Sequence, residues 1–219
     1  MNILNKKKVF IFDFDGTLVN SARIVLKVLN SLNNNKKIKM IHIKKYLSYG
    51  GDKLIESALK ISDKDEIFKQ KKIFRQKYYE TKPEKKDLYA GVEIFLKVLK
   101  KKKIKICLCT NKPYYLVKKI IYELNINNLF DLILTPEKLG VKKPNSIFIK
   151  KILKKFNIEN TEAVYVGDSN IDMELAYNNK IDFFLFYNRN CDLSDSKLKK
   201  LKKNNKIFKN YNSFLKKIN

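Results

Sequence analysis

Short apolar runs alternate with helix-like segments along most of the chain, and this alternation restricts the fold more than any other feature. Apolar residues recur at helical spacing in 92–99, for example, and then form a compact run at 104–109. Strands that alternate with helices predict a doubly wound parallel sheet with helices on both faces, an α/β fold. The expected strands are 8–12, 104–109, 130–134, 163–166 and 183–186, and the expected helices are 92–99, 114–124, 147–156 and 171–177. Apolar pairs at 207–208 and 214–215 add a last short strand and a closing helix.

Residues 21–86 interrupt the alternation with a helical pattern. Ile24, Val25, Val28 and Leu29 recur at spacings of three and four residues, and no strand-like run occurs in this segment. Roughly 70 residues are too many for a single strand-to-strand crossover. We therefore expect a small helical domain at 21–86, inserted into a core domain formed by residues 1–20 and 87–219.

The formal charge of +26 raises the question of a nucleic-acid partner. The chain has 45 lysines but only three arginines, together with 25 isoleucines and 24 asparagines, residue types that share A/T-rich codons. Genome composition therefore explains the charge, and nucleic-acid surfaces tend to use Arg for its planar fork. We expect no specific nucleic-acid partner, although weak attraction to polyanions follows from the charge.

The low numbers of cysteines and histidines and the lack of a long apolar stretch argue against several classes of protein. Three cysteines without a C-x-x-C pair argue against a disulfide framework and a thiolate zinc site, and suggest a reducing compartment. A single histidine, His42, argues against a His-rich metal centre. No apolar stretch is long enough for a membrane span, and the N-terminus does not resemble a secretory signal. We expect a cytoplasmic protein with no membrane partner.

Two carboxylates follow the first expected strand directly, in the order Asp13-Phe14-Asp15-Gly16-Thr17. Ligands of a doubly wound fold bind at the carboxyl ends of its strands. One carboxylate can attack a substrate there while the other moves a proton, and Gly16 permits a tight turn.

Residues 13–18 resemble the first motif of the haloacid dehalogenase-like phosphohydrolases. The family's other motifs follow in order, each at a strand end or a helix start: Thr110-Asn111, Lys143-Pro144 and 167–172. Each of these later motifs is weak alone, but their order and context make the resemblance specific. The resemblance implies a Rossmann-like core domain with a helical cap.

It also implies roles for individual residues. Asp13 would attack phosphorus to form an aspartyl phosphate, and Asp15 would move the protons. Thr110, Asn111 and Lys143 would bind the phosphoryl group. The cofactor would be Mg²⁺, for which the metal residues are Asp13, Asp15 through its backbone carbonyl, Asp168 and, in a supporting position, Asp172. The scarcity of histidine agrees with magnesium rather than zinc.

The substrate is indicated less directly. Asp15 favours hydrolysis of phosphate esters or mutase chemistry, since relatives with other activities carry other residues there. Residues 48–54 resemble the substrate loop of phosphoglycolate phosphatase-like members, with Gly50, Gly51 and Lys53 as candidate substrate contacts. The TNKP string at 110–113 agrees with this branch.

Phosphoglycolate is therefore the first expected substrate among small phosphorylated metabolites. A sugar or sugar-acid phosphate, or the reaction of a β-phosphoglucomutase-like mutase, is the alternative, and a basic nucleic-acid-binding protein is less favoured. The expected assembly is a monomer or a homodimer.

Overall fold

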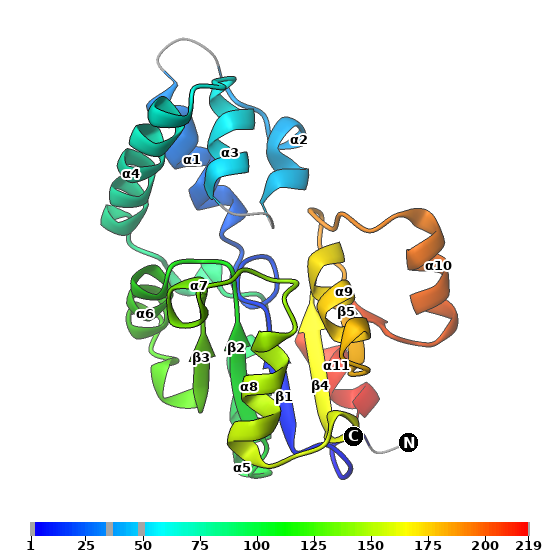
Figure 1. The fold of residues 1–219 in the computed structure, drawn as a ribbon. Coiled ribbons are helices and arrows are strands. Elements are labelled where there is room, and N and C mark those ends of the chain that lie inside the picture. The colour runs from blue at the N-terminus through cyan, green and yellow to red at the C-terminus, as the bar shows by residue number, and fades with distance from the viewer. Residues whose placement is uncertain (1–2, 34–36, 48–50, 219) are drawn as a thin grey trace.

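A single parallel sheet forms the centre of the computed structural model, which describes residues 3–33, 37–47 and 51–218 (Figure 1). In the described part of the chain the sheet has six strands in the order β3-β2-β1-β4-β5-β6. Their bounds are Val9–Phe12 (β1), Lys105–Cys109 (β2), Leu132–Leu134 (β3), Ala163–Gly167 (β4), Asp182–Phe186 (β5) and Ile207–Phe208 (β6). The chain order reverses beside β1, where a doubly wound sheet opens a crevice for ligands. The α/β prediction is confirmed.

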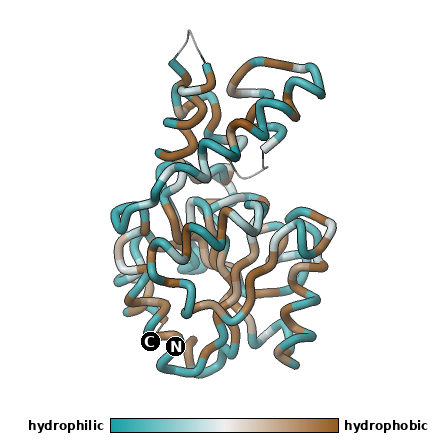
Figure 2. The backbone as a smooth tube through the Cα atoms, turned by 90° about the vertical axis from the view of Figure 1, so that its left-hand side faces the viewer, coloured by the Kyte–Doolittle hydropathy of each residue, from teal (hydrophilic) through white to brown (hydrophobic). Residues whose placement is uncertain are grey.

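Helices cover both faces of this sheet. Those of the core are Val92–Lys101 (α5), Tyr114–Glu123 (α6), Pro136–Leu139 (α7), Ile147–Phe156 (α8), Asn170–Asn178 (α9), Asp195–Lys203 (α10) and Tyr211–Ile218 (α11). Short 3₁₀ turns lie at Lys44–Tyr46, Lys85–Asp87, Asn127–Leu129 and Asn160–Glu162. Figure 2 shows the largely hydrophobic strands enclosed by helices.

The two faces of β1 enter two separate hydrophobic clusters because successive strand residues point in opposite directions. Phe10 and Phe12 face α5, where each ring centroid lies 6.1 Å from that of Phe95. Val9 and Ile11 face the other way, into a cluster that includes Cys107, Cys109 and Phe148 of α8. The central strand is thus buried on both faces.

Four further helices stand together above the carboxyl ends of the strands (Figure 1). We call them the cap helices: Ala22–Leu32 (α1), Met40–Ile43 (α2), Gly51–Leu59 (α3) and Lys64–Glu80 (α4). The apolar face of α1 is buried, and Asp63 caps α4 by accepting a hydrogen bond of 2.8 Å from the Glu66 amide. The expected domain limits at residues 21 and 86 stay a prediction.

The C-terminal part of the chain contains an element that the sequence pattern missed. Helix α10 buries only Leu201, so its lysines conceal the apolar spacing from which a helix is predicted. The expected strand and helix after it are present as β6 and α11, and the two chain ends lie close together, where the Ile3 amide donates to the Ile218 carbonyl. Across the described residues, the structure has no helix with the length and apolarity that a membrane span requires.

Phe95 offers a test of how much the core depends on one side chain. Its ring is fully buried between β1 and α11, at 5.2 Å from the centroids of Tyr211 and Phe214. We expect Phe95→Ala to lower the free energy of unfolding by about 3–5 kcal/mol, because the cavity cannot collapse between two rigid layers. Urea unfolding measures this change. Tyr122→Ala, on a side chain that is 71% exposed, should change it by less than about 0.5 kcal/mol, and equal effects would contradict the assignment.

Candidate active site

The candidate site lies where three neighbouring strands end. Asp13 follows β1, Thr110 follows β2 and Asp168 follows β4, and β1 pairs with both β2 and β4 in parallel register. The carboxyl ends of parallel strands share one edge of the sheet, so residues far apart in sequence meet there. The structure therefore brings together the motif residues that the sequence placed at separate strand ends.

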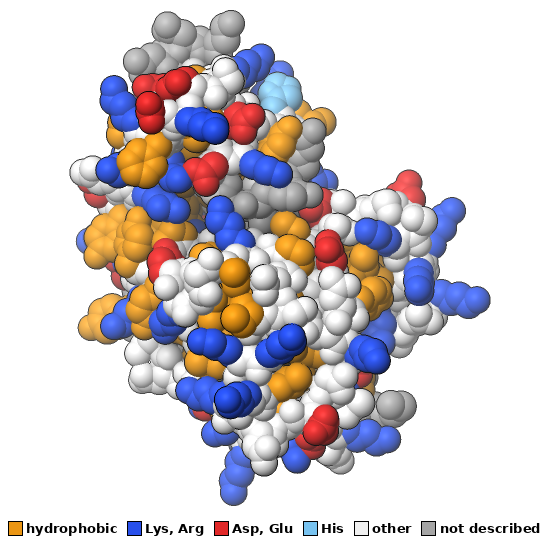
Figure 3. Space-filling view, in the orientation of Figure 1, with side chains coloured by type: hydrophobic (Ala, Val, Ile, Leu, Met, Phe, Trp, Pro, Cys, Tyr) orange, Lys and Arg blue, Asp and Glu red, His pale blue; other side chains and the backbone are white. Residues whose placement is uncertain are grey.

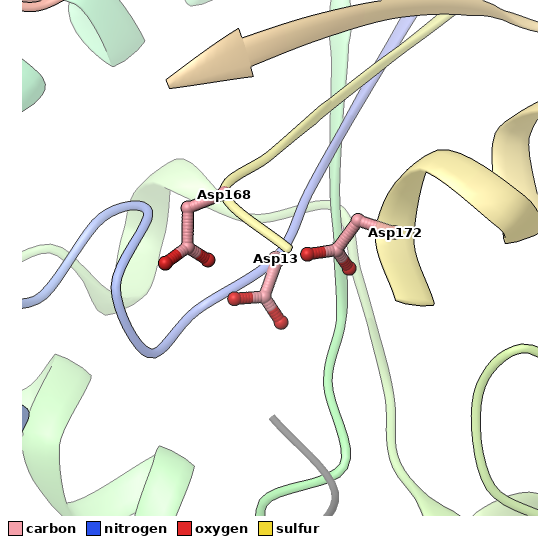
Figure 4. Close-up of side chains that lie close together, drawn as sticks. All are labelled: Asp13, Asp168 and Asp172. Atoms are coloured by element: carbon pink, nitrogen blue, oxygen red, sulfur yellow. The ribbon is translucent and has the colours of Figure 1, made fainter. Parts of the chain in front are cut away.

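Three buried carboxylates converge at this edge, those of Asp13, Asp168 and Asp172 (Figure 4). One oxygen of each lies within 4.8 Å of the others. Asp172 belongs to the first turn of α9, where it accepts hydrogen bonds from the hydroxyl and the amide of Ser169 at 2.5 and 3.2 Å. This capping box fixes the position of the carboxylate relative to β4.

The ammonium of Lys143 lies among these acids. Its Nζ donates to Asp13 at 2.5 Å, to Asp172 at 2.7 Å and to the Tyr165 hydroxyl at 3.3 Å. Burial alone would lower the pKa of Lys143, but the two carboxylates outweigh it and raise the pKa above its usual value. Lys143 therefore remains a cation at neutral pH, inside the protein.

One ammonium does not balance three buried acids. Burial raises the pKa of Asp13 to about 7 although Lys143 opposes the shift, and burial together with Asp13 and Asp172 raises that of Asp168 well above its usual range. The excess negative charge is what a bound cation would relieve. Because all the donors are oxygens, the residues fit Mg²⁺ better than a metal that prefers nitrogen or sulfur.

A tight turn after β1 holds Asp168 from the other side. Gly16 has a φ of 86°, a left-handed conformation that glycine adopts without strain, and the Thr17 hydroxyl donates to Asp168 at 3.2 Å. The amide of Asn188 donates both to the Gly16 carbonyl at 2.6 Å and to Asp168 at 2.7 Å. Asn188 thus ties the turn, β4 and the segment after β5 together.

The two residues of the second predicted motif, Thr110 and Asn111, form different hydrogen bonds. Thr110 is buried at the end of β2, and its hydroxyl accepts a hydrogen bond of 3.1 Å from the Lys112 amide. The Asn111 side chain accepts from the Lys143 amide at 2.8 Å and donates to the Lys143 carbonyl at 3.4 Å. Asn111 therefore holds the main chain that carries the buried ammonium.

A cavity of about 150 Å³ lies between this edge and the cap helices. The core contributes Asp13, Asp15, Thr110, Asn111 and Lys143, and the cap helices contribute residues that include Gly51, Leu54, Phe74, Arg75 and Tyr78. The volume is below the usual range of about 300–1,000 Å³ for sites that hold drug-sized ligands, which favours a small substrate.

The three substrate contacts predicted in the cap, Gly50, Gly51 and Lys53, differ in their position relative to this cavity. Gly51 belongs to its lining, and Gly50 lies outside the described residues. Lys53 is exposed on α3 and is not among the lining residues of the described chain.

Comparisons with known proteins agree with this geometry. Residues 10–186 match the family model described as haloacid dehalogenase-like hydrolase, which spans most of the chain. The chain belongs to the haloacid dehalogenase-like hydrolases.

Named relatives specify the kind of hydrolase. Phosphoglycolate phosphatases of Aquifex aeolicus (strain VF5) and Colwellia psychrerythraea (strain 34H / ATCC BAA-681) are 32% and 33% identical to it, over 76% and 82% of this chain and 78% and 84% of theirs. The crystal structure of a predicted phosphoglycolate phosphatase from Haemophilus somnus 129pt superposes with a TM-score of 0.85 at 25% identity, covering 98% of this chain and 99% of that one. The hydrolase is a phosphatase of this family.

The second acid of the first motif has a partner that sequence reasoning missed. Asp15 pairs with Lys112, whose Nζ lies 3.1 and 3.2 Å from the two carboxylate oxygens. The same Nζ lies 4.0 Å from the centroid of the Tyr78 ring, which belongs to α4. Lys112 thus joins the first motif to a cap helix.

Gly16 provides a test of how closely the turn approaches Asp168. A Cβ added to Gly16 would lie 2.8 Å from the Asp168 carboxyl carbon, whereas one added to Gly140, also at positive φ, would meet nothing within 4 Å. We expect Gly16→Ala to lower kcat/KM for an aryl phosphate by at least about a hundredfold, since a displacement of about 1 Å has that effect. Gly140→Ala carries the same kind of backbone strain and should stay within about threefold of the wild type. Equal losses in the two variants would show that strain alone, and not the contact with Asp168, is responsible.

Proposed function

We propose that this phosphatase hydrolyses the phosphate ester of a small carboxylate-bearing metabolite through an aspartyl phosphate on Asp13, with Mg²⁺ as cofactor and 2-phosphoglycolate as the first expected substrate. The observation that carries the proposal is the buried convergence of Asp13, Lys143, Asp168 and Asp172 at the mouth of a small cavity. The names of the relatives support the choice of substrate.

The chemistry divides into two displacements at phosphorus. A carboxylate oxygen of Asp13 forms a bond to phosphorus as the ester P–O bond breaks, and Asp15 gives a proton to the departing oxygen. Asp15 then takes a proton from a water molecule whose oxygen attacks phosphorus. The bond to Asp13 breaks, inorganic phosphate leaves, and both carboxyl groups return to their starting states.

Phosphoryl transfer depends mostly on the placement of charge. Lys143 and Thr110 line the cavity beside Asp13, where they can bind phosphoryl oxygens, and Asn111 keeps Lys143 in place. Asp13, Asp168 and the backbone carbonyl of Asp15 would hold Mg²⁺, with Asp172 in support. When bound, the cation would neutralise charge on the phosphoryl oxygens.

The face of the molecule seen in Figure 3 does not favour the nucleic-acid alternative. Lys and Arg side chains are scattered over the face seen in Figure 3 and form no continuous basic stripe there. A pattern of this kind agrees with a compositional origin of the net charge of +26.

The nucleophile is tested by Asp13→Asn. The amide cannot form the acyl phosphate, so we expect turnover to fall below about 1% of the wild-type value while the thermal midpoint shows that the protein stays folded. Turnover and the midpoint are measured on freshly purified protein whose mass excludes deamidation. Substantial activity in such a sample would refute the assignment of Asp13.

The cofactor is tested by removing divalent metal. We expect a chelator to abolish turnover, Mg²⁺ to restore it, and Ca²⁺ to inhibit, because Ca²⁺ takes more ligands in looser geometry. Mg²⁺ should also raise the thermal midpoint of the wild type but not that of Asp168→Asn. Asp195→Asn, which removes an exposed carboxylate from α10, should respond as the wild type does. Full turnover in excess chelator would rule out the metal requirement.

The substrate is tested by direct comparison of esters. We expect kcat/KM for 2-phosphoglycolate to exceed that for glucose 6-phosphate by at least about tenfold, which is about 1.4 kcal/mol of discrimination. Release of inorganic phosphate is the measurement. A better rate with a sugar or sugar-acid phosphate would overturn the choice of substrate but not the hydrolysis. An isomerised sugar phosphate as the product would indicate a mutase instead.

A further inference from the structure

Four basic side chains belong to the cavity lining: Arg75, Lys112, Lys142 and Lys143. Each lysine among them has a carboxylate partner, at 3.1 Å for Lys112 with Asp15, 3.7 Å for Lys142 with Asp52, and 2.5 Å for Lys143 with Asp13. Within residues 3–33, 37–47 and 51–218, the guanidinium of Arg75 forms no hydrogen bond or salt bridge, although its charge, after those of Lys71 and Lys142, helps to lower the pKa of the Asp52 carboxyl. Because Asp52 has its salt bridges with Lys71 and Lys142, the guanidinium of Arg75 keeps its hydrogen-bond donors for an anion from outside the protein.

The residue type is informative in a chain of this composition. Arginine occurs three times against 45 lysines. The guanidinium presents a planar fork that binds both oxygens of a carboxylate, which a lysine ammonium cannot do. An arginine in the wall of a small cavity therefore suits a carboxylate ligand.

The position of Arg75 sets which end of a substrate it would meet. Arg75 is half-buried on α4, beside the buried ring of Phe74 and one helical turn before Tyr78, and all three line the cavity. The phosphoryl-binding residues Lys143 and Thr110 line it from the core. A ligand that reaches from Thr110 to α4 therefore presents its phosphate to the core and its other end to the cap.

The remaining wall limits what can lie between the two ends. Leu54, Phe74 and Leu116 are buried apolar side chains of the lining. These three side chains give the hydroxyl groups of a sugar no hydrogen-bond partners, so such groups would depend on the few polar side chains of the lining, among them Ser21, Tyr78 and Asn190. The cavity volume of about 150 Å³ favours a short linker between the two ends.

We propose that Arg75 binds the carboxylate of the substrate, so that the enzyme selects phosphate esters of short hydroxy acids. This inference rests on the proposed function, since it assigns the part of the same substrate that lies away from phosphorus. Arg75 is then a specificity-determining residue and takes no part in proton transfer.

The first experiment measures binding without turnover, by calorimetry in buffer with Mg²⁺. The ligands are 3-phosphonopropionate, an inert analogue of phosphoglycolate, and propylphosphonate, which has a methyl group in place of the carboxylate. We expect the wild type to bind 3-phosphonopropionate at least about tenfold tighter, and Arg75→Gln to reduce that preference to less than about twofold. Arg75→Lys keeps the charge without the fork and should retain part of the preference.

The matched control is Lys69→Gln, which removes an exposed positive charge from the same helix at a position outside the lining. It should keep the full preference for the carboxylate. Equal binding of the two ligands by the wild type, or a full preference in both folded Arg75 variants, would overturn the inference. A loss of preference as large in Lys69→Gln would also overturn it, because a general effect of charge would then suffice.

A second experiment compares hydrolysis of 2-phosphoglycolate and ethyl phosphate. In Arg75→Gln we expect kcat/KM to fall about tenfold more for phosphoglycolate than for ethyl phosphate, mainly through KM, because the carboxylate contact holds ground state and transition state alike. Equal losses for the two esters would count against the inference. If the wild type hydrolysed neither ester, the proposed function would fail, whereas the calorimetric comparison would still decide the role of Arg75.

Discussion

A buried ammonium between buried carboxylates is the interaction on which the rest of the structure depends. Lys143 lies 2.5 Å from Asp13 and 2.7 Å from Asp172, and an unpaired charge at this depth would cost several kcal/mol. The three residues come from the end of β1, the segment before α8 and the first turn of α9. The observed strand order places β1 beside β4 and so brings these segments together, and the ion pairs in turn join the segments that follow different strands.

The sequence predicted this part of the molecule because its signals are local. A buried strand is recognised in the sequence as an apolar run. A motif that directly follows such a strand lies at the carboxyl edge of the sheet, and this holds without knowing which distant residues it contacts. The six strands and the sites of Asp13, Thr110 and Asp168 follow from that rule. Tyr165 and Asn188 could not be found in this way, since each acts through contacts with residues distant in sequence. Asn188 had one available signal, its place just after the expected strand 183–186.

The cap was harder to predict for a physical reason. Helical periodicity identifies a helix and its apolar face, but the side chains beside that face can point to solvent or to a cavity, depending on how the helices pack. Lys53 and Arg75 illustrate the difference. Lys53 precedes the buried Leu54 on α3 and is exposed, whereas Arg75 follows the buried Phe74 on α4 and lines the cavity. Composition also conceals such residues, because one basic side chain among 48 has no distinguishing pattern.

The cavity has a core end, at the carboxylates and Lys143, and a cap end, at Arg75, and these two ends differ in the charge that they present to an anion. At the core end, Asp13, Asp168 and Asp172 outnumber Lys143, so under the proposed function the cation would offset the carboxylates when a phosphate binds there. At the cap end, Arg75 supplies a positive charge that forms no salt bridge within the described chain and is offset only in part by Asp52, which has the nearer partners Lys71 and Lys142. A substrate with a phosphate and a carboxylate could therefore be held at the cap end by the protein itself and at the core end together with the cation. This asymmetry would orient the substrate, because the stronger charge of the phosphate is directed to the end where the cation adds to Lys143.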